Sequence, residues 1–182
     1  MRVVIVYESM FGNTRQVAEA IGARVARADE VLVVPVENAS AELVKTADLL
    51  VVGGPTHAHG MSRPSSRRAA VEMAGKPGSG LILEPGADGI GLREWLGSLG
   101  RLTVSAAAFD TRIRALPIFT GRASRRIDRL LRRSGARIVA APTSFFVDRT
   151  SRLTAGELAR AHQWGKELAH LVDRTAAPGV GG

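Results

Sequence analysis

The sequence predicts one α/β domain, built as a doubly wound parallel sheet with helices on both faces. Short apolar runs rich in β-branched residues recur along the chain, and segments with apolar residues at helical spacing separate them. This alternation is typical of a parallel sheet in a three-layer α/β/α arrangement. A length of 182 residues and a hydrophobic content of 45% suit a single core. We therefore expect one domain over residues 1–175 and a disordered C-terminal tail over 176–182.

The first predicted strand leads into a candidate phosphate site. Val3 to Tyr7 is an apolar run without alternation, as expected of a strand covered on both faces. A small, hydroxyl-bearing loop over Ser9–Thr14 follows, and apolar residues then recur at helical spacing from Val17. The first amides of a helix lack acceptors within it and carry the positive end of its dipole, which favours a bound anion. Gly12 lets the backbone approach such an anion closely.

The other elements repeat the alternation. Five strands are expected, over residues 3–7, 30–36, from 48 onward, 102–109 and 137–147. Helical spacing is found over 40–47, 64–74, 90–99, 123–134 and 154–172, and the glycine- and proline-rich stretch 75–89 is expected to be a loop. Pro35 and Pro142 place their strands at sheet edges, because proline cannot donate a ladder hydrogen bond.

Helix spacing also predicts which residues face the core. After Pro64, the inward face is expected to contain Ala69, Ala70, Met73 and Ala74. Thr154 and Glu157 are expected to form a capping box at the start of the last helix, with Leu158 beginning its inward face.

Composition limits the classes of protein. The formal charge is +8, and only three of the 25 basic residues are lysines. The chain has no cysteine, which excludes disulfides and thiolate metal sites, and no export signal or membrane-spanning run precedes the first strand or follows it. A cytoplasmic protein without membrane attachment is expected. The arginine excess is compatible with a basic docking surface or with compositional bias.

The loop over Ser9–Thr14 is not one of the common nucleotide motifs, since it has one glycine and no lysine. Ser9, Gly12 and Thr14 instead match the pattern Ser/Thr-x-Thr/Ser-Gly-x-Thr that follows the first strand of flavodoxins, and the chain resembles that family. Phe11 departs from the pattern, where a hydroxyl is usual. The resemblance implies the strand order 2-1-3-4-5 and non-covalently bound FMN.

The resemblance also implies which residues would contact FMN. The phosphate would lie on Ser9, Met10, Phe11, Gly12, Asn13 and Thr14. Two loops would hold the ring, one formed by Pro55, Thr56, His57, Ala58, His59 and Gly60, and the other by Ala108, Phe109, Asp110, Thr111 and Arg112. In the second loop, Phe109 would pack on the ring, and Asp110 and Thr111 would bond to its polar edge. His57 or His59 is a candidate proton donor to the ring.

Several alternatives stay open for these residues. The first loop is also compatible with an ordinary helix capped by Ser9 or Asn13, and the other two with plain polar turns. His57 and His59 suggest a metal, but no third ligand is apparent, so no metal site is expected. The arginine-rich helix is compatible with non-specific contacts to nucleic acid, although no specific nucleic-acid partner is expected. No protein catalytic residues are identified, because no Ser/His/Asp order or carboxylate pair appears.

Within this frame, electron transfer by bound FMN is the expected function. NAD(P)H-dependent reduction of quinone or flavin is the first alternative, so whether the protein is an enzyme stays open, and a flavin-free binding module is the second. Arginines near the predicted loops are expected to stabilise anionic reduced FMN and raise its potential. The expected partner is a redox protein, acidic if the basic surface is functional, or NAD(P)H and a quinone. The sequence does not indicate an oligomeric state.

Overall fold

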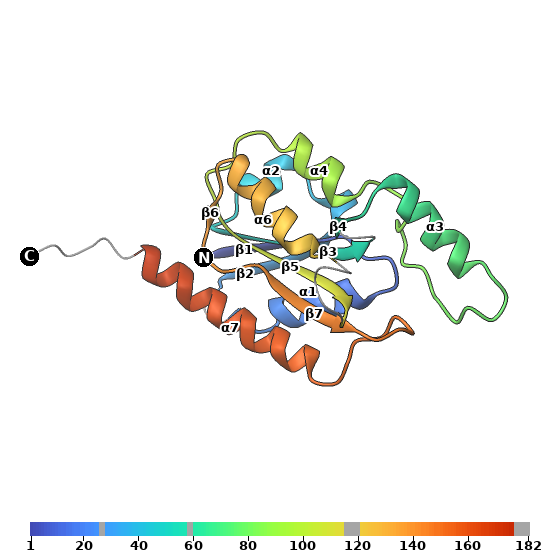
Figure 1. Cartoon of the computed structure of the whole chain (residues 1–182). Coiled ribbons are helices and arrows are strands. Elements are labelled where there is room, and N and C mark those ends of the chain that lie inside the picture. The colour runs from blue at the N-terminus through green and yellow to red at the C-terminus, as the bar shows by residue number, and fades with distance from the viewer. Residues whose placement is uncertain (26–27, 58–59, 115–120, 177–182) are drawn as a thin grey trace, which may run out of the picture.

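A central sheet organises the molecule, as a computed structural model shows (Figure 1). The structure describes residues 1–25, 28–57, 60–114 and 121–176. The parallel strands are β1 (Arg2–Tyr7), β2 (Glu30–Pro35), β3 (Leu49–His57), β5 (Ser105–Ile113), β6 (Arg137–Ile138) and β7 (Thr143–Val147). A two-residue strand, β4 (Gly60–Met61), runs antiparallel to the end of β3.

The strand order is β2-β1-β3-β5-β6, and β7 also pairs with β5. This is the predicted order 2-1-3-4-5, with the predicted fifth strand divided into β6 and β7, both parallel to β5. Pro142 lies between the two pieces, and Pro35 is the last residue of the opposite edge strand, β2. Both prolines therefore lie at sheet edges, as their missing amide donor requires.

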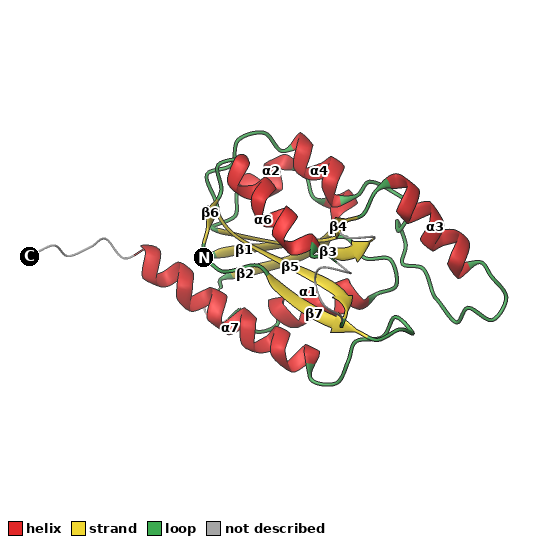
Figure 2. Ribbon diagram, viewed as in Figure 1, coloured by secondary structure: helices red, strands yellow, loops and turns green. Residues whose placement is uncertain are grey.

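Helices cover both faces of the sheet (Figure 2). They are α1 (Asn13–Gly22), α2 (Ala41–Lys45), α3 (Pro64–Ala74), α4 (Leu92–Ser98), α6 (Ala123–Arg133) and α7 (Glu157–Ala176), with a 3-10 turn η1 (Val36–Asn38) after β2. One core lies under α2, α4 and α6, and the other under α1 and α7. Val4 and Val6 enter the first core and Val3 and Ile5 the second, which explains why β1 has no polar face.

Three sequence-based details are wrong. β5 runs on to Ile113, because Asp110, Thr111 and Arg112 continue the ladder with β7. Thr154 and Glu157 do not form a capping box: the Glu157 carboxylate accepts a hydrogen bond from the Phe146 amide at 2.9 Å, and the Thr154 hydroxyl donates to the Phe146 carbonyl at 3.3 Å. Leu158 is exposed rather than inward-facing. Residues 177–182 of the predicted tail lie outside the described residues, and Ala176 ends α7.

Helix α3 lies beyond the end of the sheet, next to the loop over residues 75–89 (Figure 1). It begins at Pro64, as predicted, but its predicted inward face does not enter either main core. Ala70 is buried, whereas Ala69 and Met73 are exposed. In the part of the chain that the structure describes, no helix has the length and apolarity needed to cross a membrane.

Candidate functional site

The loop between β1 and α1 forms the centre of the candidate site. Gly12 has φ +83°, a left-handed conformation that favours glycine, and a Cβ placed there would lie 3.1 Å from Glu84 Oε1. The Ser9 hydroxyl accepts a hydrogen bond from the Gly12 amide at 3.1 Å, and the Met10 carbonyl accepts one from the Glu84 amide at 2.9 Å. These bonds fix a turn that leads directly into α1.

Neither Ser9 nor Asn13 caps α1, so the alternative of an ordinary side-chain-capped helix is wrong. Gly12 occupies the N-cap position without a side-chain bond to the helix. The Gln16 amide donates to the Gly12 carbonyl at 3.0 Å, so the amides of Asn13, Thr14 and Arg15 precede the first helical bond. The Asn13 side chain instead donates to the Ser151 carbonyl at 2.7 Å. The arrangement leaves the positive end of the α1 dipole to attract an anion.

The end of β3 provides a second wall. Thr56 and His57 pair with Met61 and Gly60 of β4, so Pro55 to His57 belong to a strand and not to the predicted loop. The Thr56 hydroxyl accepts a hydrogen bond from the Ala123 amide at the start of α6 at 3.0 Å. Ala58 and His59, also predicted site residues, lie outside the described residues.

The end of β5 provides a third wall, but Phe109 does not belong to it. The Phe109 ring is fully buried and makes edge contacts with Phe145 at 6.0 Å and Trp164 at 6.2 Å between centroids. It also covers Gly53, where a Cβ would lie 2.0 Å from the ring. Phe109 is therefore a core residue between the sheet and α7, and its expected packing on a bound ring is wrong. Ala108 is likewise buried within β5.

The polar residues after Phe109 have separate uses. Asp110 is fully buried, and its carboxylate accepts a hydrogen bond from the Ser124 amide at 2.8 Å, which stabilises the first turn of α6. Its expected bond to the edge of a ring is therefore not supported. The Thr111 hydroxyl shares a hydrogen bond of 2.8 Å with the Thr14 hydroxyl, which joins the third wall to the first loop.

These walls enclose a cavity of about 400 Å³, a volume in the usual range for small-molecule sites. Predicted residues that line it are Ser9, Met10, Phe11, Asn13, Thr14, Pro55, Thr56, His57, Thr111 and Arg112. Residues that the sequence analysis missed are Ser66, Ala69, Ala70, Met73, Ile113, Val147, Arg149 and Ser151. The α3 residues among them recur at i, i+3, i+4 and i+7. Ala69, Ala70 and Met73 belong to the face that the helical spacing assigned to the core, and Ser66 extends this face by one turn.

The third wall of the cavity is positively charged. Arg112 is buried, and burial lowers its pKa from the ordinary value, with a further contribution from the nearby Arg122 that Asp110 opposes. The Arg112 guanidinium lies over the Phe146 ring at 5.2 Å from its centroid. Arg149 also lines the cavity, and it is exposed. A bound anionic group would therefore be stabilised from this side.

A buried polar network joins the elements that surround the cavity. Glu8 accepts a hydrogen bond from the Leu92 amide at 2.9 Å, and burial raises the pKa of its carboxyl above the ordinary value. Arg67, also buried, donates to the Ser62 hydroxyl at 3.1 Å and to Glu94 at 3.3 Å. The network joins the ends of β1 and β4 to α3 and α4, and it holds a charged pair close to the cavity.

His57 is half-buried close to this network. Burial lowers its pKa from the ordinary value, and the positive charge of Arg67 lowers it further. A lowered pKa favours the neutral imidazole, which makes His57 a weaker proton donor to a bound ring. Among the described residues, no group of three or more His, Asp or Glu side chains is placed to hold a metal ion.

The site therefore combines a helix N-terminus for an anionic group with a cavity walled by three strand ends. The sequence model of the family described as Flavodoxin matches residues 5–167. No curated protein matches the sequence.

Solved structures of flavodoxins share the fold. A flavodoxin from the domain Archaea superposes with a TM-score of 0.66 at 20% identity, over 95% of this chain and 99% of the other. Oxidised flavodoxin 1 from Bacillus cereus gives 0.62 at 16% identity, over 97% and 100%. The flavodoxin of Streptococcus pneumonia TIGR4 gives 0.63 at 20% identity, over 93% and 99%.

Proposed function

Because the chain belongs to the flavodoxin family, we propose that it binds FMN non-covalently and transfers single electrons between other redox carriers. The observation that carries this proposal is the loop over Ser9–Thr14, in which a left-handed Gly12 turns the chain into an uncapped helix. FMN, when bound, supplies the redox chemistry. The protein binds and orients the cofactor and sets the charge around it.

The residues at the site fit a mononucleotide. The first-turn amides of α1 and the Thr14 hydroxyl would hold the phosphate, and the Ser9 hydroxyl can donate in addition to the bond it accepts from Gly12. The ring would lie in the cavity between the end of β3 and the apolar face of α3, which contributes Ala69 and Met73. Phe11, which replaces the usual hydroxyl, lines the same cavity.

Binding of FMN is tested by titrating the apoprotein with FMN and measuring the quenching of flavin fluorescence. We expect Gly12→Ala to weaken FMN binding about tenfold, because alanine lets the free loop leave the left-handed conformation. Returning to that conformation on binding would cost about 1–2 kcal/mol. Gly97→Ala is the matched control, since a methyl group there meets nothing within 4 Å. Equal affinities in the two variants would contradict the proposed phosphate site.

The effect of the positively charged wall on bound FMN is tested by the midpoint potential of the cofactor. Arg112 and Arg149 are expected to stabilise the anionic reduced form and to raise the midpoint potential about 50 mV above that of free FMN. A midpoint well below that of free FMN would refute this charge effect.

Quinone reduction is separated from electron carriage by stopped-flow kinetics. We expect NAD(P)H to reduce the protein slowly whether or not a quinone is present, as for a carrier that receives electrons from another protein. Fast NAD(P)H oxidation that depends on the quinone would assign the chain to the oxidoreductases. If the apoprotein does not bind FMN, the remaining candidate function is a flavin-free binding module on the same fold.

A further inference from the structure

A group of arginines from three elements lies close to the β3 wall of the cavity. We call Arg63, Arg93, Arg126 and Arg129 the arginine patch. Arg63 immediately precedes α3, Arg93 belongs to α4, and Arg126 and Arg129 lie one turn apart on the exposed side of α6. The Arg93 side chain donates to the Met61 carbonyl at 3.1 Å and to the Ser62 carbonyl at 3.2 Å, so its guanidinium lies directly beside β4.

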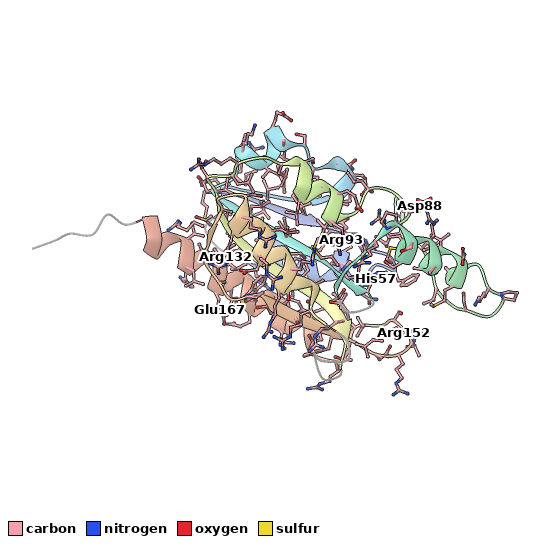
Figure 3. The ribbon with its side chains drawn as sticks, turned by 45° about the horizontal axis from the view of Figure 1, so that its top comes forward. His57, Asp88, Arg93, Arg132, Arg152 and Glu167 are labelled. Atoms are coloured by element: carbon pink, nitrogen blue, oxygen red, sulfur yellow. The ribbon has the colours of Figure 1, made fainter. Side chains whose placement is uncertain are left out.

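The patch adjoins the proposed flavin site. β4 pairs with Thr56 and His57, and both of these residues line the cavity. The start of α6 is joined to Thr56 by the hydrogen bond from the Ala123 amide. Figure 3 shows Arg93 and His57 toward the same end of the molecule and Arg132 farther back along α6. A protein bound to the patch would therefore cover the β3 side of the cavity.

The positive charge of the patch is not neutralised by ion pairs within the described parts of the chain. None of the four arginines forms an ion pair there: Asp128, the acidic residue of α6, binds Arg132, and Glu94 binds Arg67. Burial lowers the pKa of Arg93 from the ordinary value, and nearby Arg126 and Arg63 lower it further. Glu94 and Glu8 act in the opposite direction without reversing this shift. The acidic neighbours therefore offset the repulsion among these arginines only in part, and an anionic surface would reduce it further.

We propose that the arginine patch is the docking surface for an acidic electron-transfer protein. This inference rests on the proposed function, because it places the partner beside the flavin. Carboxylates suit the patch, since guanidinium groups bind them in a bidentate manner. Charge pairs at the rim of an interface mainly increase the rate of association and select the partner, as a transient redox complex requires.

The test compares two double variants with the same change in net charge. Arg63→Gln/Arg126→Gln removes two exposed charges from the patch. Arg101→Gln/Arg133→Gln removes two exposed charges away from the patch. Arg101 follows α4, Arg133 is the last residue of α6, and both residues line a separate surface hollow. The probe is an acidic plant-type ferredoxin, and its binding to the holoprotein and to the apoprotein is measured by biolayer interferometry at low and high salt. Thermal unfolding and FMN affinity confirm that each variant is folded.

We expect the patch variant to bind the ferredoxin about fivefold more weakly at low ionic strength, the control to stay within about twofold of the parent protein, and the difference to vanish in high salt. Equal weakening of both variants, or of neither, would overturn the proposal. Tighter binding of duplex DNA than of ferredoxin, lost in the patch variant, would also overturn it in favour of nucleic acid. The apoprotein measurement does not need FMN, so failure to bind FMN would reject the proposed function separately.

Discussion

Glu8 is a carboxylate that the fold keeps inside the protein. It is 6% exposed, and its ionised form is stabilised by the Leu92 amide and by nearby Arg67. These interactions do not offset the loss of water, since burial still raises its pKa. Ionised Glu8 therefore costs folding free energy at neutral pH, and the same residue joins the end of β1, next to the loop over Ser9–Thr14, to the start of α4.

The cost should appear as a pH-dependent effect of Glu8→Gln. A raised folded pKa means that the folded state holds the proton more tightly than the unfolded state, so the penalty is absent at low pH and grows as pH rises through the folded pKa. We expect the difference in Tm, variant minus parent, to be about 2–4 °C more positive at pH 8 than at pH 4.5, which corresponds to about 1 kcal/mol. Calorimetry measures it, and Glu72→Gln on the surface of α3 is the control. A difference independent of pH would show that Glu8 does not titrate in this way.

At the scale of elements, strands were easier to predict from the sequence than their ends. Apolar runs identified β1, β2, β3 and β5, because both faces of this sheet are covered. The end of β5 was missed, since Asp110, Thr111 and Arg112 look like a turn until their buried partners are known. Such partners lie far away in sequence, as the Thr14 hydroxyl does, and no local pattern reveals them.

The site was predicted in the same uneven way. Its first loop could be predicted locally, because a glycine and hydroxyls before a helix suit an anion site, but the same residues also suit an ordinary helix cap. The contribution of α3 was misassigned, since apolar spacing does not distinguish a face that packs on the core from one that lines a cavity. Met73 is 52% exposed, which the spacing alone cannot show.

The packing of β5, β7 and α7 around Phe109 leads to a prediction that contrasts two phenylalanines. Phe109→Leu should lower the free energy of unfolding by about 1–2 kcal/mol, because it removes edge contacts with Phe145 and Trp164, and it should leave FMN affinity within about twofold. Phe11→Leu should instead weaken FMN binding and leave the free energy of unfolding nearly unchanged, since Phe11 lines the cavity and is partly exposed. Urea unfolding and FMN titration of both variants test this. If Phe109→Leu lost FMN affinity without losing stability, Phe109 would be a cofactor-binding residue and not only a core residue.

At the scale of the whole molecule, positive charges outnumber negative charges. The chain has 25 basic and 17 acidic side chains, and most of its ion pairs within the described residues involve an exposed partner, where such pairs contribute little. Positive charges on α6 and around the cavity repel one another across the surface.

Salt should therefore stabilise the protein. We expect the Tm of the apoprotein to rise by about 2–5 °C between 10 mM and 0.5 M sodium chloride, because screening removes repulsion among the excess positive charges. Chloride is preferred to phosphate or sulfate, which would bind the phosphate loop itself. A Tm that falls with added chloride would mean that attractive pairs outweigh the repulsion.

The prolines at the two borders of the sheet affect how readily a second chain can pair with an edge strand. Pro35 is the last residue of the six-residue strand β2, and Pro142 separates β6 from β7, so a proline limits the exposed ladder at each border. An intact border strand is a template on which a neighbouring chain can add its own strand and begin a fibril. Here a proline stops the template at each border, which limits the length over which a neighbouring strand could pair.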